Sequence, residues 1–288
     1  MKPAAFNYHS PTRLSEVFTI LNSSVNSRVL AGGQSLMPML NYRLLEVEDL
    51  IDLNGIQELS GIKQNNNIIE IGAMTRQFEI AESPIIQEYL PLMWKAIKYV
   101  GHVQTRNRGT VGGSLCQMDP SAELSLVASA YKAELIIQSD QGERVLSIDD
   151  FSIGYMTTAL NSNEILKSIR FTPWSKASKS SFIEFSRRHG DFAVVSAACL
   201  MELSKNRINQ LSLVLGGVGA QPFRITDLES VLEGKTLEEV DLIDLISKLS
   251  FPDMLSDKLY PAWYREHLSK VLIKRVLHEA FSTSENIS

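Results

Sequence analysis

The sequence is poor in cysteine and has none of the usual metal-binding patterns. Only two of its 288 residues are cysteine, Cys116 and Cys199, and they lie far apart. A zinc site or a Cys-ligated iron–sulfur cluster needs several ligands at short spacings, and no CxxC pair or Cys/His cluster is present. The five histidines lack metal-ligand spacing as well. We therefore expect no metal site in this chain.

Neither an excess of positive charge nor a long apolar run is present. Lys and Arg total 28 against 33 Asp and Glu, which gives a net charge of −5. Binding to a phosphate backbone depends on massed Lys and Arg, so a nucleic acid partner is not expected. No stretch approaches the ~20 apolar residues of a membrane span, and the N-terminus lacks the apolar run of a signal peptide. These absences predict a cytoplasmic protein without a membrane span.

What the sequence does contain is short apolar segments separated by Gly, Pro and Asn, which predict a mixed α and β chain. Strands are expected at 27–31, 50–53, 68–71, 134–138, 164–171, 194–200 and 210–215. Helices are expected after Ser10-Pro11 and over 84–100 with a boundary at Pro91, 124–131, 228–249 with breaks, and 263–280. We expect a loop over 101–123. The polar run 174–181 predicts a domain boundary, although a surface loop would have the same composition.

Two segments with paired glycines stand out, AGGQSLMPML at 31–40 and RNRGTVGGSL at 106–115. Glycine has no Cβ and tolerates positive φ, so successive backbone N–H groups in such a segment can converge on one anion, typically a pyrophosphate. A tight turn is the alternative for either segment alone. Neither matches G-x-G-x-x-G or G-x-x-x-x-G-K-[ST], so the sequence does not support a Rossmann site or a P-loop.

Two further polar segments follow. In QMDPSAE, residues 117–123, Asp119 and Pro120 are typical of a helix start, with Glu123 in the first turn. Alternatively, a carboxylate here accepts hydrogen bonds from a ribose or a ribityl chain. FSRRHGDFA, residues 185–193, is interpreted either as a solvated turn or as a loop that lines a cofactor edge.

A third glycine group, at 216–219, is interpreted as a turn. No Ser/His/Asp arrangement indicates a nucleophile, so we assign no catalytic residue. Any redox chemistry would then come from a bound cofactor.

Taken together, AGGQSLMPML, RNRGTVGGSLCQMDPSAE, FSRRHGDFA and WYREHLSKVLIKRVL resemble the FAD-binding medium subunit of the molybdenum hydroxylases. That family includes xanthine dehydrogenase, carbon monoxide dehydrogenase and the nicotine and quinoline dehydrogenases, and EFSRRHGDFA is most similar to the last two. The resemblance implies an α+β fold. A vanillyl-alcohol-oxidase (PCMH)-type FAD-binding domain would occupy 1–174, with lobes at about 1–55 and 56–174. A small C-terminal domain of antiparallel sheet and helices, like that of carbon monoxide dehydrogenase flavoproteins, would occupy 175–288.

The resemblance also implies a set of cofactor-binding residues. They are Ala31, Gly32, Gly33, Gln34, Ser35, Leu36, Val100, Thr110, Gly112, Gly113, Ser114, Gln117, Glu123, Leu166, Arg187 and Asp191. The two glycine segments would hold the pyrophosphate. Gln117 and Glu123 match the phosphate and ribityl side of FAD, and Val100 and Leu166 match positions that use apolar or main-chain atoms. Arg187 and Asp191 match the loop near the flavin ring.

The sequence departs from the family pattern at two positions. Many relatives carry TIGGN where this chain has TVGGS, which puts a hydroxyl at Ser114 in place of an amide. Some relatives have Lys where Glu184 stands, so the role of that position does not carry over directly.

The function implied is electron transfer from [2Fe–2S] clusters of a partner through FAD to an external acceptor. A large subunit would hold the molybdenum cofactor and a small substrate, for example an N-heterocyclic one, and a small subunit would hold two [2Fe–2S] clusters. The assembly would be a heterotrimer or a dimer of heterotrimers, with NAD, a quinone, oxygen or another carrier as acceptor. Two alternatives stay open: a self-contained FAD oxidase or reductase of the same fold, and a non-catalytic nucleotide-binding module.

Overall fold

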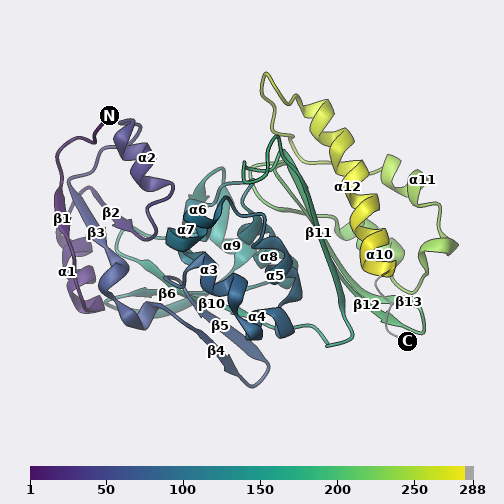
Figure 1. Ribbon diagram of the computed structural model, residues 1–288, viewed down its shortest axis with the longest axis horizontal. Coiled ribbons are helices and arrows are strands. Elements are labelled where there is room, and N and C mark those ends of the chain that lie inside the picture. Colours follow the sequence, from purple (N-terminus) through teal and green to yellow (C-terminus); the bar gives the residue numbers. More distant parts are fainter. Residues whose placement is uncertain (283–288) are drawn as a thin grey trace.

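The computed structural model describes residues 1–282. Three sheets follow one another along the chain and lie side by side along its longest dimension (Figure 1). The N-terminal sheet is parallel, and the two larger sheets are antiparallel. In the described part of the chain, no helix is long and apolar enough to cross a membrane.

The N-terminal sheet has the strand order β1-β3-β2, with helices attached to it. Its strands are β1 (Asn7–His9), β2 (Ser27–Leu30) and β3 (Asp49–Asp52), and its helices are α1 (Leu14–Ser23) and α2 (Leu36–Asn41), followed by the 3-10 turns η1 (Leu53–Gly55) and η2 (Gln57–Leu59). Leu14, Val17, Phe18 and Leu21 form the buried stripe of α1. The expected helix start at Ser10-Pro11 comes too early, because Arg13 is the residue before the first helical turn.

The central sheet has the order β4-β5-β10-β6-β7 and is covered by helices. Its strands are β4 (Ile62–Asn65), β5 (Ile68–Gly72), β6 (Glu134–Ser139), β7 (Gly142–Ser147) and β10 (Ile165–Phe171), with the small pair β8 (Ser152–Gly154) and β9 (Thr157–Thr158) beside it. Its helices are α3 (Gln77–Glu82), α4 (Pro84–Tyr89), α5 (Pro91–Ala96), α6 (Val103–Arg108), α7 (Val111–Gln117), α8 (Glu123–Tyr131) and α9 (Ile148–Phe151). Pro91 at the start of α5 confirms the expected boundary between two short helices.

The C-terminal sheet has the order β11-β12-β13-β14. Its strands are β11 (Lys179–Phe185), β12 (Val195–Ser204), β13 (Arg207–Gly216) and β14 (Phe223–Arg224), and its helical segments are α10 (Thr226–Leu232), η3 (Leu237–Glu239), α11 (Leu242–Ser247) and α12 (Ala262–Ser282). The long helix α12 lies across this sheet (Figure 1). The polar start of β11 overlaps the run 174–181, so part of that run is a strand.

The C-terminal sheet packs on the central helices through its other face. Phe182, Ala198, Leu200 and Val214 belong to the same apolar core as the central sheet and its helices. The hydroxyl of Ser212 adds a hydrogen bond of 2.9 Å to the carbonyl of Ala130. Because the core continues past residue 174, the division of the chain at 174/175 stays a prediction.

Candidate functional site

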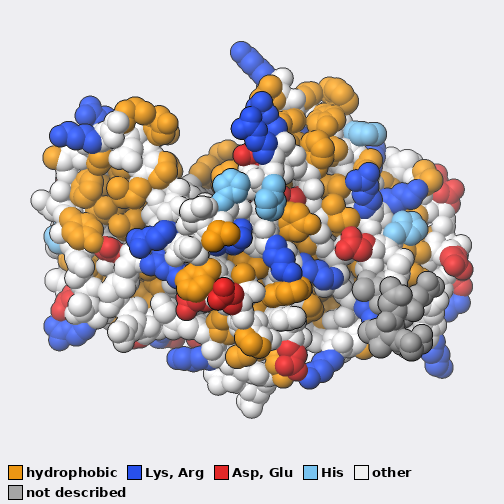
Figure 2. Space-filling view, viewed as in Figure 1, with side chains coloured by type: hydrophobic (Ala, Val, Ile, Leu, Met, Phe, Trp, Pro, Cys, Tyr) orange, Lys and Arg blue, Asp and Glu red, His pale blue; other side chains and the backbone are white. Residues whose placement is uncertain are grey.

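The fold brings the two glycine segments into contact. A Cβ atom built on Gly32 would overlap the Arg108 carbonyl and lie 2.8 Å from the Cα of Gly109, and one built on Gly113 would lie 3.3 Å from the Cβ of Ala31. Only a residue without a side chain fits at Gly32. Figure 2 shows the surface hollowed between the lobe that carries α2 in Figure 1 and the central part that carries α6 and α7. The two segments meet where these parts join.

The first segment carries open hydrogen-bond donors. It forms the turn between β2 and α2, and Gly33 turns the chain with a φ of +72°. Among the described residues 1–282, the backbone N–H groups of residues 32–36 have no acceptor; the N–H of Met37 is the next to find one, at 3.2 Å on the Gly33 carbonyl. Five consecutive donors in a turn fit the demand of an anion such as a pyrophosphate.

The second segment differs, because it is helical. Where a loop over 101–123 was expected, α6 and α7 form, and Thr110 caps α7 by accepting a 3.0 Å hydrogen bond from the N–H of Gly113. The N–H groups of Val111, Gly112 and Ser114 also have acceptors within the chain, at 2.8–3.2 Å. The local propensity for a loop yields here to packing, since a Cβ on Gly112 would lie 2.7 Å from the Ala73 carbonyl oxygen.

Gln117 is the last residue of this helix, and Glu123 begins the next one. The amide of Gln117, at the end of α7, contacts the sulfur of Met39 in α2 at 3.9 Å, which adds a second link between the two sides. Glu123 is the first residue of α8 and is buried. Burial, and secondarily the carboxylates of Glu184 and Asp119, raise the pKa of Glu123 to about 8.

Glu184, whose charge acts on Glu123, is a second carboxyl group with a raised pKa. Burial raises its pKa to about 7, and its Oε2 is buried without a hydrogen-bond partner. Its register partner on β12 is Ser196, whose Oγ is also buried and unpaired, and Ser196 in turn pairs with Gly216 on β13. These polar groups mark the end of the apolar interface between the C-terminal sheet and α8.

Arg187 and Asp191 lie in the exposed loop between β11 and β12. The N–H of Val194 closes this loop on the Phe185 carbonyl at 2.7 Å. Gly190, with a φ of +87°, rests against the His102 ring, because a Cβ there would overlap the imidazole. The loop therefore reaches the start of α6. In residues 1–282 no hydrogen bond joins the Arg187 or Asp191 side chain to either glycine segment.

Val100 and Leu166 lie in the central core. Both side chains are less than a tenth exposed. The carbonyl of Val100 accepts a 2.9 Å hydrogen bond from Arg106. Leu166 precedes a bulge in β10, next to the backbone of Lys167 that binds the N–H of Ala73. Their predicted contact with the cofactor stays a prediction.

The third glycine group forms a junction as well as a turn. The N–H of Gly217, whose φ is +73°, donates to the Pro120 carbonyl at 2.8 Å. The buried guanidinium of Arg265, from α12, donates to the carbonyls of Gly217 and Val194. The group thus ties α12 to the segment that precedes Glu123.

Two residues at the glycine segments were not found from the sequence. The guanidinium of Arg76 donates to the Arg108 carbonyl and, at 2.5 Å, to Oδ1 of Asn54, while Nδ2 of Asn54 donates to the Ala31 carbonyl at 3.0 Å. Neither residue belongs to a glycine motif, and no local pattern indicates bonds between residues so far apart in the chain.

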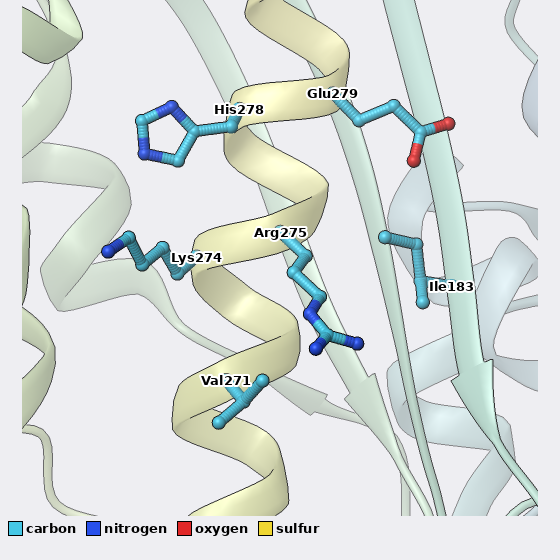
Figure 3. A pocket seen from close by; sticks show the side chains of 6 residues that line it. All are labelled: Ile183, Val271, Lys274, Arg275, His278 and Glu279. Atoms are coloured by element: carbon cyan, nitrogen blue, oxygen red, sulfur yellow. The ribbon is translucent and has the colours of Figure 1, made fainter.

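A separate groove of about 580 Å³ lies between α12 and β11. Its lining residues, labelled in Figure 3, are Ile183, Val271, Lys274, Arg275, His278 and Glu279. All of them come from the C-terminal sheet and its long helix, and none belongs to the predicted cofactor-binding set. No group of three or more His, Cys, Asp or Glu side chains in the described part of the chain could hold a metal ion.

Comparison with known proteins gives matches over both halves of the chain. Residues 4–174 match the model of the FAD binding domain in molybdopterin dehydrogenase, and residues 180–280 match that of the CO dehydrogenase flavoprotein C-terminal domain. The chain is 35% identical to the glyceraldehyde dehydrogenase medium chain of Sulfolobus acidocaldarius, over 97% of this chain and 99% of that one. It is 38% identical to the caffeine dehydrogenase subunit beta of Pseudomonas sp. strain CBB1, over 82% of this chain and 80% of that one.

The fold also matches solved structures. Quinoline 2-oxidoreductase from Pseudomonas putida 86 superimposes with a TM-score of 0.93 and 32% identity, covering 99% of both chains. These matches confirm the α+β fold class expected from the sequence, with two lobes and a C-terminal unit of antiparallel sheet and helices.

Proposed function

The chain belongs to the family of FAD-binding medium subunits of molybdenum hydroxylases, and from that premise we propose that it passes electrons from the [2Fe–2S] clusters of a partner through FAD to an external acceptor. The observation that carries the proposal is the row of five open backbone N–H groups at residues 32–36, held against a second glycine segment.

The residues present fit the cofactor. The open donors of the first segment suit a doubly charged pyrophosphate. Neutral backbone N–H groups can bind such an anion without burying a charged side chain. In the second segment, Gly113 allows the close approach to Ala31 of the first, Gly112 allows α7 to pack against Ala73, and the Ser114 hydroxyl supplies a side-chain hydrogen-bond donor. When bound, FAD supplies the redox chemistry, which the side chains of this chain do not.

The buried carboxyl of Glu123 fits the ribityl side of FAD. With a pKa raised to about 8, it holds a proton near neutral pH and can donate or accept a hydrogen bond. We place Gln117 beside it, and Arg187 and Asp191 in the loop that lies nearest the flavin ring. These four assignments rest on the family resemblance.

The partners follow from the relatives. Similar chains are named medium chain or subunit beta, so we infer that this chain works beside a large molybdenum-cofactor subunit and a small [2Fe–2S] subunit. A heterotrimer or its dimer, a cytoplasmic location, and NAD, a quinone, oxygen or another carrier as acceptor complete the proposal. The relatives act on different compounds, and the organic substrate would bind in the large subunit.

Gentle purification of the tagged chain from its native host tests this function. We expect a flavin absorption spectrum overlaid by iron–sulfur absorbance, with one larger and one smaller protein on the gel. A flavin spectrum from the chain alone, together with turnover of a small substrate by that chain, would contradict the partner-dependent role. A colourless preparation would contradict FAD binding itself.

A further inference from the structure

The two glycine segments are held together by a side-chain bridge. Arg76 lies between β5 and α3, outside both segments, and donates to the Arg108 carbonyl within the second one. Through Asn54 it is also linked to the Ala31 carbonyl at the start of the first. The planar guanidinium holds two acceptors at a fixed angle, which an ammonium group cannot do. The bridge therefore sets the spacing of the two segments.

The backbone reinforces this bridge from the same side. Arg76 and Thr110 form an isolated antiparallel β-bridge, and the N–H of Gln77 donates to the Gly109 carbonyl at 2.9 Å. Asn54 is in turn fixed by Asp52, which accepts from its backbone N–H at 2.8 Å. The start of α3 is thus fastened to the second segment, and the guanidinium extends from there to the first.

The bridge also leaves positive charge that no carboxylate in residues 1–282 neutralises by an ion pair. Within residues 1–282, neither Arg76 nor Arg108 takes part in an ion pair. Burial, and then the charge of Arg108, lower the pKa of the half-buried Arg76. The nearby carboxylate of Glu79 accepts from the backbone N–H of Arg76 rather than from its guanidinium, at 2.7 Å.

Asp52 is the other nearby carboxylate, and it is occupied as well. It accepts from the Tyr8 hydroxyl at 2.5 Å and from Asn54. Two like charges kept close together beside five open N–H groups favour the binding of an anion.

We propose that Arg76 is a positioning residue for FAD, which holds the two glycine segments at binding distance through Asn54 and the Arg108 carbonyl and adds positive charge for the pyrophosphate. This inference rests on the proposed function. It assigns separate contributions to the geometry of the bridge and to its charge, and these can be measured separately.

Three variants separate the two contributions. Arg76→Gln removes both the planar guanidinium and its charge. Arg76→Lys keeps the charge but cannot hold two acceptors at a fixed angle. Asn54→Ala breaks the link to Ala31 while it keeps Arg76. Arg207→Gln is the matched control, because Arg207 makes an exposed ion pair with Glu239 in the C-terminal unit. All are made in the full chain and purified with whatever partners accompany it.

The measurements are FAD retained per chain and the rate of FAD release, followed by flavin fluorescence at low and high NaCl. We expect release to be about tenfold faster or more in Arg76→Gln and a few-fold faster in Arg76→Lys and Asn54→Ala. High salt should accelerate release in the unmodified protein, Arg76→Lys and Asn54→Ala, and have a weaker effect in Arg76→Gln, since a missing charge cannot be screened. A purely structural role would leave that salt dependence unchanged.

Four results would overturn the proposal. If Arg76→Gln retains as much FAD as the control Arg207→Gln, Arg76 has no positioning role, and the proposed function still stands. Equal salt dependence in all variants would remove the charge contribution. If Arg76→Gln does not fold, release rates of Asn54→Ala and Arg76→Lys like that of the unmodified protein would exclude the positioning role instead. An unmodified protein without FAD would overturn the proposed function as well.

Discussion

The two glycine segments look alike in sequence and differ in structure. In the first, residues 31–35 form an irregular turn before α2, and the N–H groups of 32–36 are open in the described part of the chain. In the second, residues 110–114 are the cap and first residues of helix α7, and the N–H groups of residues 111–114 all have acceptors in the chain. The same residue pattern therefore serves two purposes: open donors in one segment and close packing in the other.

Because of this difference, we expect substitutions in the two segments to affect different properties, FAD binding and the stability of the fold. Changes in the first segment should appear mainly in FAD binding, because the N–H groups of residues 32–36 have no acceptor in residues 1–282. Changes in the second, and in the buried Glu123 that follows it, should also appear in the stability of the FAD-free fold, because these groups are packed or bonded within the chain. A variant that violates this division would show where the two segments are coupled.

The largest effect is expected for Gly32→Ala. The new methyl group overlaps the Arg108 carbonyl and lies 2.8 Å from the Gly109 Cα, so the two segments must separate. We expect FAD binding to weaken by about a hundredfold, in addition to the loss of about 1–3 kcal/mol in unfolding free energy that such an overlap costs the FAD-free protein. Fluorescence titration with FAD measures the first and chemical denaturation the second. Full FAD affinity in this variant would contradict the division.

Gly112→Ala should instead act mainly on stability. Its methyl group would lie 2.7 Å from the Ala73 carbonyl oxygen, where α7 packs against the turn that follows β5. Overpacking of this kind costs about 1–3 kcal/mol of unfolding free energy. Denaturation of the FAD-free protein checks this loss, and a variant with unchanged stability and lost FAD would place residue 112 with the first segment.

The pH dependence of stability tests the contribution of Glu123, which follows the second glycine segment. The pKa of Glu123 is raised from 4.5 to about 8, so the folded state binds its proton more tightly than the unfolded chain does. Stability should therefore fall as pH rises from about 4.5 to about 8, by up to about 1.4 kcal/mol per pH unit from this group. Glu123→Gln should flatten that decline in urea midpoints taken across this range. Parallel curves for the two proteins would show that Glu123 does not contribute.

The smallest effect is expected for Thr110→Ala. Its hydroxyl accepts from the Gly113 N–H at 3.0 Å as the cap of α7. Loss of such a cap costs about 1 kcal/mol. Thermal unfolding measures the loss, and Thr110→Ser, which keeps the hydroxyl, is the control. A cap mutation with no effect on stability, or an equal loss of stability in the serine variant, would argue against this role of the hydroxyl.

The glycine segments, seven of the fourteen strands in residues 1–282 and the break at Pro91 could be predicted from the sequence, because these depend on local composition. Sequence reasoning missed α6 and α7, since Val111 and Gly112 form a helix only where their N–H groups meet carbonyls of residues 73–75 in another strand region. It treated Lys179 and Ser180 as part of a polar connection, although pairing with Met201 and Leu200 makes them a strand. The bridge from Arg76 to Asn54 depends on residues far apart in the chain, which no local pattern reveals.

The central claim is that the backbone N–H groups of residues 32–36 hold the pyrophosphate of FAD. Hydrogen–deuterium exchange of the protein with and without FAD tests it most directly, because the chain itself protects residues 111–114 in both states. The account predicts that added FAD slows exchange at 32–36 and changes it little at 111–114. Unchanged exchange at 32–36 with FAD bound would contradict the account.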